Sequence, residues 1–326
     1  MIEILLKEWI ERVKYYIHLI ADYSIKESQV GAVLDDVLNL SGKMLRSKLL
    51  LLCAFLGSNW KNNKEKICKL AAMVELTHLA SLIHDDIVDD SPYRRGKVSI
   101  QGKYGKDAAV FAGDFLIARI FYYGAVENLN EAVSILSKTV EYMCIGEIEQ
   151  DLCRYQEDIS EKKYFENIER KTAALFQAAS YIGAKESGCS EKIIQKLELF
   201  VKNLGLMFQL KDDILDFTSN SKELGKETHK DFQNGIYTFP VIMALKNPKA
   251  REVLLPIMRK NKEEKLSLAE ILQLQNYIIQ FGGIEASYEK IKYLSTINRQ
   301  LIKELGQNSK ITVYLEKILN DLEVEN

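Results

Sequence analysis

Helix-breaking residues are scarce in this chain of 326 residues, which has only four prolines and 17 glycines. Proline interrupts a helix and glycine weakens one, so their scarcity favours long helices and argues against a loop-rich fold. A convincing run of strands is also missing, whereas apolar residues recur at helical spacing through most of the sequence. We therefore expect an all-α protein, and its hydrophobic content of 47% is ample for a large core.

An excess of charge of either sign is missing as well, because 44 basic and 46 acidic residues leave a net charge of −2. No basic tract with interleaved aromatic residues occurs, so nucleic-acid binding is not expected. The five cysteines form no C-x-x-C pair, and their odd number is typical of free thiols in a reducing compartment, which predicts a cytoplasmic protein. Charged residues interrupt the long apolar stretches, the N-terminal one included, so neither a transmembrane segment nor a signal peptide is predicted.

Long helices are predicted along most of the chain. Their expected ranges are 1–21, 43–57, 65–90, 106–127, 130–158, 161–186 and 190–217, followed by shorter helices from 238 to the end. Turn-forming residues predict loops at 57–63, 91–105, 218–235 and 246–249. No linker rich in proline, glycine or serine divides the chain. Residues 1–326 are therefore expected to form a single domain, a helical bundle that encloses a central cleft.

Two aspartate-rich segments, H-D-D-I-V-D-D at 84–90 and K-D-D-I-L-D-F at 211–217, are the most informative motifs. In each, the first and last acids of the D-D-x-x-D unit stand at i and i+4, so on a helix they project from one face. These acids are Asp85, Asp89, Asp212 and Asp216. Acid pairs at this spacing often form a solvated face or a helix N-terminus. Two near-identical copies within apolar sequence instead favour a metal site, because partly buried like charges repel unless cations neutralise them.

The ligand chemistry narrows the choice of metal. Carboxylates without an accompanying set of cysteines and histidines suit Mg²⁺, which keeps waters and shares its coordination shell with phosphates. The two motifs therefore predict a diphosphate held between metal ions.

From about residue 40 to 245 the chain resembles the trans-polyprenyl diphosphate synthases. The matching segments, in family order, are S-G-K-M-L-R at 41–46, E-L-T-H-L-A-S-L-I-H-D-D-I-V-D-D-S-P-Y-R-R-G at 75–96, A-G-D-F-L at 112–116, K-T-A at 171–173, F-Q-L-K-D-D-I-L-D at 208–216, L-G-K at 224–226 and Y-T-F-P at 237–240. The resemblance implies an all-α prenyltransferase that uses Mg²⁺, with about three ions per active site.

The resemblance also divides the basic residues between two diphosphates. The residues implied to bind isopentenyl diphosphate are Lys43, Arg46, His78 and Arg95, and those implied to bind the allylic diphosphate are Arg94, Lys171 and Lys226. Lys43 and Arg46 are expected on the first turn of the 43–57 helix, where free N–H groups and the helix dipole favour an anion. His78 precedes Asp85 by two turns on the same face, and arginine forks suit phosphate oxygens.

Further residues complete the implied site. Thr172 and Gln209 would place neutral oxygens near the carbon that becomes cationic, and Asp231 would support the second metal cluster. The candidate catalytic set is Asp85, Asp89, Lys171, Thr172, Gln209, Asp212 and Lys226. The chain departs from the family pattern at Ser41, Met44, Ser47 and Ile236. Those four departures put the affinity for diphosphate in question, although not the reaction.

The implied reaction is a head-to-tail (1′-4) condensation of isopentenyl diphosphate with an allylic diphosphate such as farnesyl or geranyl diphosphate. The growing tail would pass Ser81 and Ala80, four and five residues before Asp85, and then Thr77. Short-chain members of the resembled family commonly carry Phe or Tyr at this place, whereas none of these residues is aromatic, so the resemblance implies a long product of about C30–C50. Two alternatives stay open: a short product of about C15–C20, and small residues that only permit close helix packing.

Other functions remain to be distinguished. A class I terpene cyclase shares the helical bundle and the first aspartate motif, but it would carry an Asn/Ser/Glu-type second metal site and needs no second diphosphate. A catalytically silent subunit is the non-enzyme alternative, although no acid of either motif is missing. The resemblance implies a homodimer, with a small accessory subunit as the alternative, and at most peripheral membrane contact through a hydrophobic product.

Overall fold

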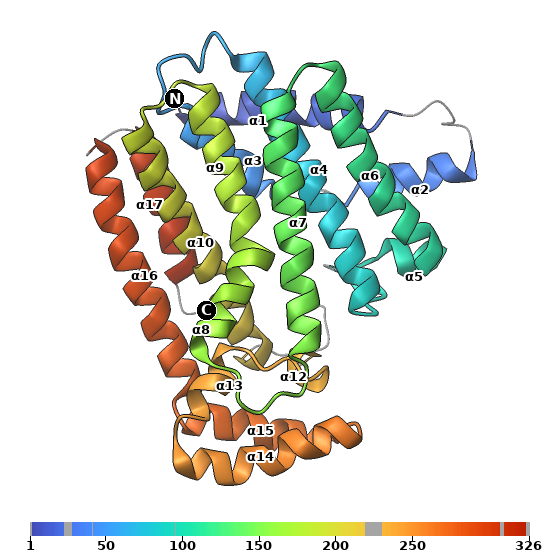
Figure 1. The fold of residues 1–326 in the computed structure, drawn as a ribbon, viewed down its shortest axis with the longest axis vertical. Helices are drawn as coiled ribbons and strands as arrows, with labels where there is room; N and C mark the ends of the chain where they lie inside the picture. The colour runs from blue at the N-terminus through green and yellow to red at the C-terminus, as the bar shows by residue number, and fades with distance from the viewer. Residues whose placement is uncertain are drawn as a thin grey trace. The chain divides into compact units, whose positions relative to one another are not determined.

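The computed structural model describes residues 2–22, 28–40, 42–94, 96–218, 230–306 and 310–323. Across these ranges regular structure is almost entirely helical, and the only sheet among them is a two-stranded hairpin (Figure 1). This confirms the predicted all-α class. The elements are α1 (Ile2–Ile20), α2 (Gln29–Leu38), α3 (Leu45–Ala54), α4 (Lys64–Val88), β1 (Tyr93–Arg94), β2 (Lys97–Val98), α5 (Ile100–Tyr104), α6 (Lys106–Val126), α7 (Asn130–Leu152), α8 (Glu161–Ile168), η1 (Glu169–Ala173), α9 (Ala174–Glu186), α10 (Glu191–Thr218), α12 (Lys230–Gln233), α13 (Phe239–Ala244), α14 (Pro248–Glu263), α15 (Leu268–Gln280), α16 (Gly283–Gly306) and α17 (Lys310–Glu323).

Most predicted long helices agree with the structure, and α1, α4, α6 and α10 match their expected ranges within two residues at each end. The predicted 130–158 helix ends earlier, at Leu152. The predicted 161–186 helix is divided into α8, the π-helical turn η1 and α9. In addition, α2 and α5 form where no helix was predicted. Each has a serine N-cap, Ser28 or Ser99, whose side chain accepts a backbone N–H.

The chain divides into two compact units, one formed by residues 1–140 and 175–199 and the other by residues 141–174 and 200–326. The borders fall inside α7, after the first residue of α9 and inside α10, and no loop rich in proline or glycine marks them. The single domain and its central cleft stay predictions.

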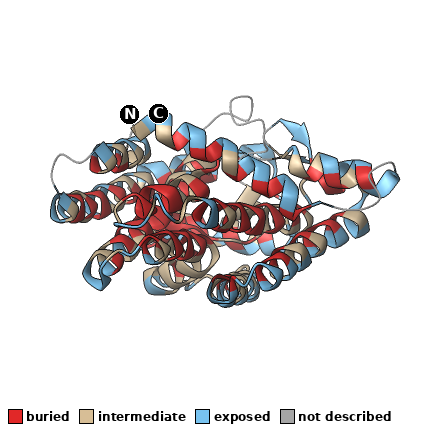
Figure 2. Ribbon diagram, turned by 90° about the horizontal axis from the view of Figure 1, so that it is seen from above, coloured by how far each residue is buried: buried red, intermediate tan, exposed pale blue. Residues whose placement is uncertain are grey.

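In the unit of residues 1–140 and 175–199, α4 packs against α1, α3 and α6, and it is buried on nearly all sides. Residues 49–54 of α3 are completely buried as well. In Figure 2, by contrast, other helices carry buried residues along one side and exposed residues along the other. Gly183 allows α9 to approach α3 closely, since a Cβ there would overlap the carbonyl of Leu50.

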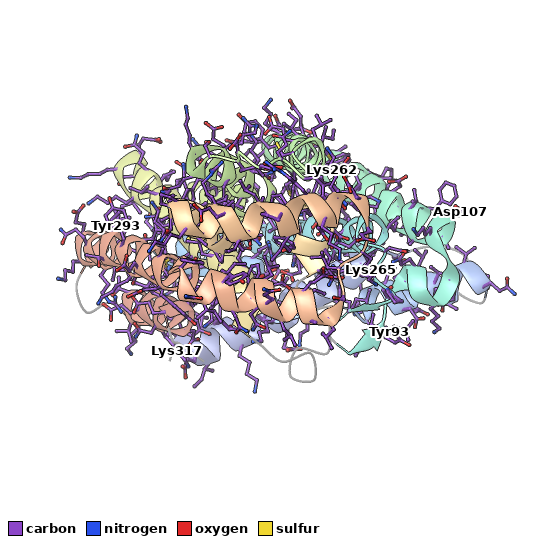
Figure 3. All side chains as sticks on the ribbon, turned by 90° about the horizontal axis from the view of Figure 1, so that it is seen from below. Tyr93, Asp107, Lys262, Lys265, Tyr293 and Lys317 are labelled. Atoms are coloured by element: carbon purple, nitrogen blue, oxygen red, sulfur yellow. The ribbon has the colours of Figure 1, made fainter. Side chains whose placement is uncertain are left out.

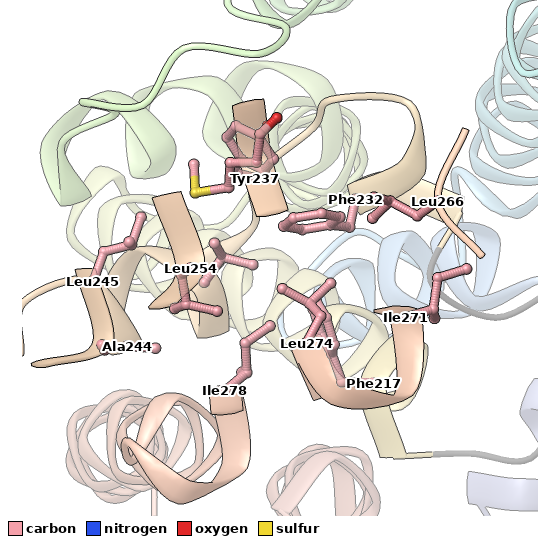
Figure 4. Packing of buried hydrophobic residues seen from close by; sticks show 13 residues of the cluster. Phe217, Phe232, Tyr237, Ala244, Leu245, Leu254, Leu266, Ile271, Leu274 and Ile278 are labelled. Carbon is pink, nitrogen blue, oxygen red and sulfur yellow. The ribbon is translucent and has the colours of Figure 1, made fainter. Parts of the chain in front are cut away.

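In the unit of residues 141–174 and 200–326, a core of 13 buried residues involves α13, α14 and α15 (Figure 4). Phe217 at the end of α10 and Phe232 on α12 belong to it, so the helix that carries the second aspartate motif is anchored in this core. Helices α14 and α15 pack together, and α16 packs against α17.

Two of the described helices, α4 and α6, are long and apolar enough to cross a membrane by length and composition alone. In α4, 72% of the apolar window is buried inside the protein, as expected of a core helix, whereas in α6 the buried share is 39%. Much of the apolar surface of α6 therefore faces outward.

Candidate active site

The first aspartate motif lies at the C-terminal end of α4. Asp89 caps the helix, and its backbone N–H donates to the carbonyl of Asp85 at 2.9 Å, as the i, i+4 spacing requires. Asp85 and Asp89 are partly exposed, whereas Asp86 between them is 3% exposed. Because the C-terminus of a helix carries partial negative charge, the two outer acids stand where a cation is favoured.

Arg94, predicted to bind the allylic diphosphate, lies on β1 and is bound to Asp86. Its Nε donates to both carboxylate oxygens of Asp86, at 2.8 and 2.9 Å, and the two side chains are only 16% and 5% exposed. The carbonyl of Asp86 accepts two more hydrogen bonds, from the Ser91 N–H at 2.9 Å and from Gln101 Nε2 at 2.6 Å. Figure 3 labels Tyr93, the neighbour of Arg94 in this hairpin. The hairpin is thus fastened to the aspartate motif.

Arg46 and His78, both predicted to bind isopentenyl diphosphate, lie in contact. Arg46 Nη1 donates to His78 Nε2 at 2.8 Å, and the guanidinium lies 4.5 Å from the centre of the Phe176 ring. Because Nε2 accepts this bond, we assign the proton of neutral His78 to Nδ1. The Phe176 ring and the His78 imidazole hold the Arg46 guanidinium in one orientation, which is suited to recognising a planar set of phosphate oxygens.

Lys43 lies two residues before α3, so the expectation that it stands on the first helical turn was wrong. The helix begins at Leu45 because Met44 has a left-handed φ of 52° and serves as the N-cap. Arg46 remains in the first turn, while Lys43 is exposed in the preceding loop.

Ser47, one of the departures from the family pattern, is completely buried and bonded to Glu75. Its hydroxyl lies 2.9 Å from Glu75 Oε2 and 3.0 Å from the Ala71 carbonyl, and its N–H donates to the same Glu75 oxygen at 3.4 Å. A proline at this position would have neither the hydroxyl nor the N–H, so serine makes polar contacts that proline could not make. Burial raises the pKa of Glu75, although the Ser47 hydrogen bonds act in the opposite direction.

The second aspartate motif lies near the C-terminal end of α10 and repeats the pattern of the first. Asp212 is exposed and Asp216 is partly exposed, but Asp213 is 1% exposed. Burial raises the pKa of Asp213 to about 7, and the charges of Asp231 and Asp212 act in the same direction. Asp231 therefore lies near this motif, as the prediction of a supporting role requires.

Asp213 holds a chain of hydrogen bonds that reaches Thr172. Tyr164 donates its hydroxyl to Asp213 Oδ2 at 2.5 Å, and Gln209 Nε2 donates to Asp213 Oδ1 at 2.9 Å. The hydroxyl of Thr172 in turn donates to Gln209 Oε1 at 2.9 Å. Thr172 and Gln209, which were predicted to lie near the reacting carbon, are thus hydrogen-bonded to each other.

Lys171 and Thr172 stand on the π-helical turn η1. A Cβ at Gly146 of α7 would lie 3.0 Å from the Lys171 nitrogen, and a Cβ at Gly205 of α10 would lie 2.7 Å from Ala173 Cα. Gly205 therefore allows α10 to approach this turn closely, and a side chain at Gly146 would be tightly packed against it. Such π-helical turns are rare and frequently occur at functional sites.

Lys171, predicted to bind the allylic diphosphate, donates from Nζ to Glu147 Oε2 and to Gln150 Oε1, both at 2.9 Å. Sequence reasoning missed these partners on α7 and also Tyr164, and it gave Asp213 no role apart from its place in the second motif. The acids and amides in G-E-I-E-Q-D at 146–151, at the end of a less polar helix, were an available signal for Glu147 and Gln150. No comparable signal marked Tyr164.

The predicted chain-length residues line one part of α4. Ala80 and Thr77 are 0% and 2% exposed, whereas Ser81 is partly exposed. The hydroxyls of Thr77 and Ser81 bond to carbonyls of their own helix, those of Met73 and His78. Both hydroxyls are therefore satisfied within the helix.

Helix α6 lies opposite these residues. A Cβ at Gly124 would lie 3.0 Å from Met73 Cε, and a Cβ at Gly113 would overlap His84 Nε2, so α4 and α6 run antiparallel in contact. Ala80 stands seven residues after Met73 and four before His84, so it lies on the same face of α4 that contacts α6.

Some predicted residues lie outside the described residues: Ser41, Arg95 and Lys226. Within the described ranges, no three His, Cys, Asp or Glu side chains gather closely enough to hold a metal ion by themselves. Mg²⁺ usually takes one or two carboxylates and completes its shell with water and substrate phosphate. The accessible outer acids of each motif fit that requirement.

Comparisons with known proteins agree with these motifs. The family model described as polyprenyl synthetase matches residues 27–275. Heptaprenyl diphosphate synthase component 2 of Bacillus subtilis (strain 168) is 38% identical over 230 residues, which are 71% of this chain and 65% of that protein. The protein of the same name from Geobacillus stearothermophilus is 34% identical over 265 residues, 80% of each chain.

A solved structure is also similar along nearly the whole chain. The polyprenyl synthase from Caulobacter crescentus CB15, crystallised with calcium and isoprenyl diphosphate, superposes with a TM-score of 0.88 at 28% sequence identity. The likeness covers 99% of this chain and 96% of the other.

Proposed function

Since the chain belongs to the polyprenyl synthetase family, we propose that it is the catalytic subunit of a long-chain polyprenyl diphosphate synthase. The observation that carries the proposal is the repeated D-D-x-x-D motif, in which the outer acids are accessible and the middle acid is buried. The enzyme is a prenyltransferase that condenses isopentenyl diphosphate with an allylic diphosphate. Farnesyl and geranyl diphosphate are the proposed primers.

Asp85, Asp89, Asp212 and Asp216 would hold Mg²⁺, about three ions in all, and the bound metal would supply charge neutralisation for the allylic diphosphate. Arg94 and Lys171, with Lys226, bind the oxygens of that diphosphate. The leaving diphosphate stays bound to these arginine and lysine side chains when its C–O bond breaks.

The oxygens of Thr172 and Gln209 face the allylic cation, where neutral dipoles stabilise positive charge without reacting with it. Arg46 and His78, together with Lys43 and Arg95, hold isopentenyl diphosphate. The double bond of isopentenyl diphosphate attacks the cation, and loss of a proton to the departed diphosphate gives the lengthened allylic product. No enzyme nucleophile takes part.

A product of about C30–C50 is supported by small residues at the chain-length positions and by relatives named heptaprenyl diphosphate synthases. The balanced charge and unpaired cysteines support a cytoplasmic location, with membrane contact limited to the hydrophobic product.

Incubation of the purified chain with labelled isopentenyl diphosphate, farnesyl diphosphate and Mg²⁺ tests the function. Reversed-phase chromatography of the dephosphorylated products should show label in chains of about C30–C50. A terpene cyclase would convert farnesyl diphosphate to hydrocarbon without using the label, and a silent subunit would form no product; either result would contradict the proposal.

We further propose that the exposed face of α6 binds a second copy of this chain. Phe111, Tyr122 and Val126 are 71%, 61% and 60% exposed on this helix, and their spacing of 11 and four residues places them on one face of it. A homodimer covers such an apolar face with an identical one and leaves no apolar surface open. The two relatives named component 2 make an accessory subunit the alternative.

Light scattering of the purified chain should give twice its mass of 37.4 kDa. Phe111→Glu should shift the mass to that of a monomer, whereas Ile4→Glu, a matched change at a residue 74% exposed on α1, should not. A monomeric parent chain that becomes active only with a second protein would support the accessory subunit instead.

A further inference from the structure

The two aspartate motifs share a feature that their metal-binding role does not use. Successive residues on a helix point about 100° apart, so residues i and i+4 lie on one face while residue i+1 points to another. Asp86 and Asp213 are the i+1 residues, and they are 3% and 1% exposed, whereas the outer acids of both motifs are accessible. Both middle acids have hydrogen-bond partners in the protein.

Asp86 orients Arg94 by one edge only. Both carboxylate oxygens of Asp86 accept from Arg94 Nε, and among the described residues no hydrogen bond involves the terminal Nη groups of this arginine. A guanidinium held at Nε presents its two Nη groups in a fixed plane, which is the geometry that pairs with two phosphate oxygens. The carbonyl of Asp86 also accepts from Ser91 and Gln101, so this one residue fastens the hairpin through side chain and backbone.

Asp213 orients an amide in the same manner. Oδ1 of Asp213 accepts the hydrogen bond from Gln209 Nε2, so the Nε2 end of the Gln209 amide points to Asp213. That orientation turns Gln209 Oε1 toward Thr172, whose hydroxyl donates to it. The Thr172 hydroxyl directs its hydrogen to Gln209 Oε1, so the lone pairs of the Thr172 oxygen and the second lone pair of Oε1 can face a cation.

We propose that Asp86 and Asp213 are positioning residues and not metal ligands. Asp86 aims the Nη edge of Arg94 at the allylic diphosphate, and Asp213 sets the oxygens of Gln209 and Thr172 toward the reacting carbon. This inference rests on the proposed function and deepens it. Each motif then has two functions on one helical turn, because the outer acids bind metal while the middle acid positions a substrate-binding side chain.

The first test compares Asp86→Asn with Asp85→Asn in steady-state assays that vary farnesyl diphosphate, isopentenyl diphosphate and Mg²⁺ separately. Asp86→Asn should raise the KM for farnesyl diphosphate about tenfold and leave the half-saturating Mg²⁺ concentration unchanged. Asp85→Asn should lower kcat by about 10³-fold and raise the Mg²⁺ requirement. An increased Mg²⁺ requirement in Asp86→Asn, with an unchanged KM for farnesyl diphosphate, would overturn the inference.

A double-mutant cycle separates positioning from general damage to the fold. Arg94→Gln should also raise the KM for farnesyl diphosphate. Adding Asp86→Asn to Arg94→Gln should raise this KM no further, because Asp86 acts through Arg94. Additive effects would refute this. If Asp86→Asn does not fold, as judged by circular dichroism, Arg94→Gln alone still decides which substrate the pair serves: an effect on the KM for isopentenyl diphosphate only would refute the assignment.

Asp213→Asn tests the proposed role of Asp213. Asparagine can donate as well as accept, so Gln209 is no longer forced into one orientation, and kcat should fall about 10- to 100-fold with both KM values within about twofold. A raised Mg²⁺ requirement would instead make Asp213 a ligand. If the parent chain itself forms no product, the proposed function fails; if the parent is active and the variants behave as ligand variants, only this inference fails.

Discussion

Replacing Ser81 by phenylalanine should shorten the product. Ser81 lies one helical turn before Asp85 on the same face of α4, and it is the only member of the chain-length set that is not buried. An aromatic ring there would lie across the path of a tail that leaves the metal-binding face. Ala80 has no such space, because it is 0% exposed and lies on the face of α4 that packs against α6.

The expected cost to stability differs between the two positions. Ser81→Phe loses one hydrogen bond to the His78 carbonyl, worth about 1 kcal/mol, and its ring can occupy the exposed side. Ala80→Phe must force a ring between packed helices, which costs about 1–3 kcal/mol. The melting temperature of Ala80→Phe should therefore fall by a few degrees more than that of Ser81→Phe.

Both variants are assayed with geranyl diphosphate as primer, followed by chromatography of the dephosphorylated products. Ser81→Phe should yield mainly products of about C15–C20, and the parent products of about C30–C50. An unchanged long-chain distribution in an active Ser81→Phe enzyme would refute the reasoning. Shortening in Ala80→Phe alone would show that the tail passes on the α6 side of the helix.

Other predictions concern metal, substrate binding and pH. Asp212→Ala should lower kcat about 10³-fold or more in Mg²⁺ titrations, and near-normal turnover would contradict a metal-binding role. Arg46→Ala should raise mainly the KM for isopentenyl diphosphate; an equal rise for the allylic substrate would refute that assignment. Burial raises the pKa of Glu75 above its ordinary value of 4.5, so the folded state binds its proton more tightly and the free energy of unfolding should fall as pH rises through that interval. Glu75→Gln should remove this part of the slope in urea titrations, and an unchanged slope would contradict it.

The helical class and the candidate metal acids could be predicted from the sequence because they depend on local spacing. Apolar residues at intervals of three and four produce a helix wherever they occur, and acids at i and i+4 then share a face of it. Asp85 with Asp89 satisfies this rule in α4, so the pairing required no knowledge of the remaining chain. The start of α3 was misplaced because the left-handed conformation of Met44 leaves no clear mark in its residue type.

Other features depend on residues far apart in the sequence, and only the tertiary structure decided them. Asp213 and Tyr164 are 49 residues apart, and Lys171 and Glu147 are 24 apart, so no spacing rule connects them. The sequence alone determined that each D-D-x-x-D unit holds three aspartates at helical spacing. Which of the three is buried, and which side chain it then holds, followed from the packing of neighbouring elements, because burial obliges a carboxylate to find donors in the surrounding protein.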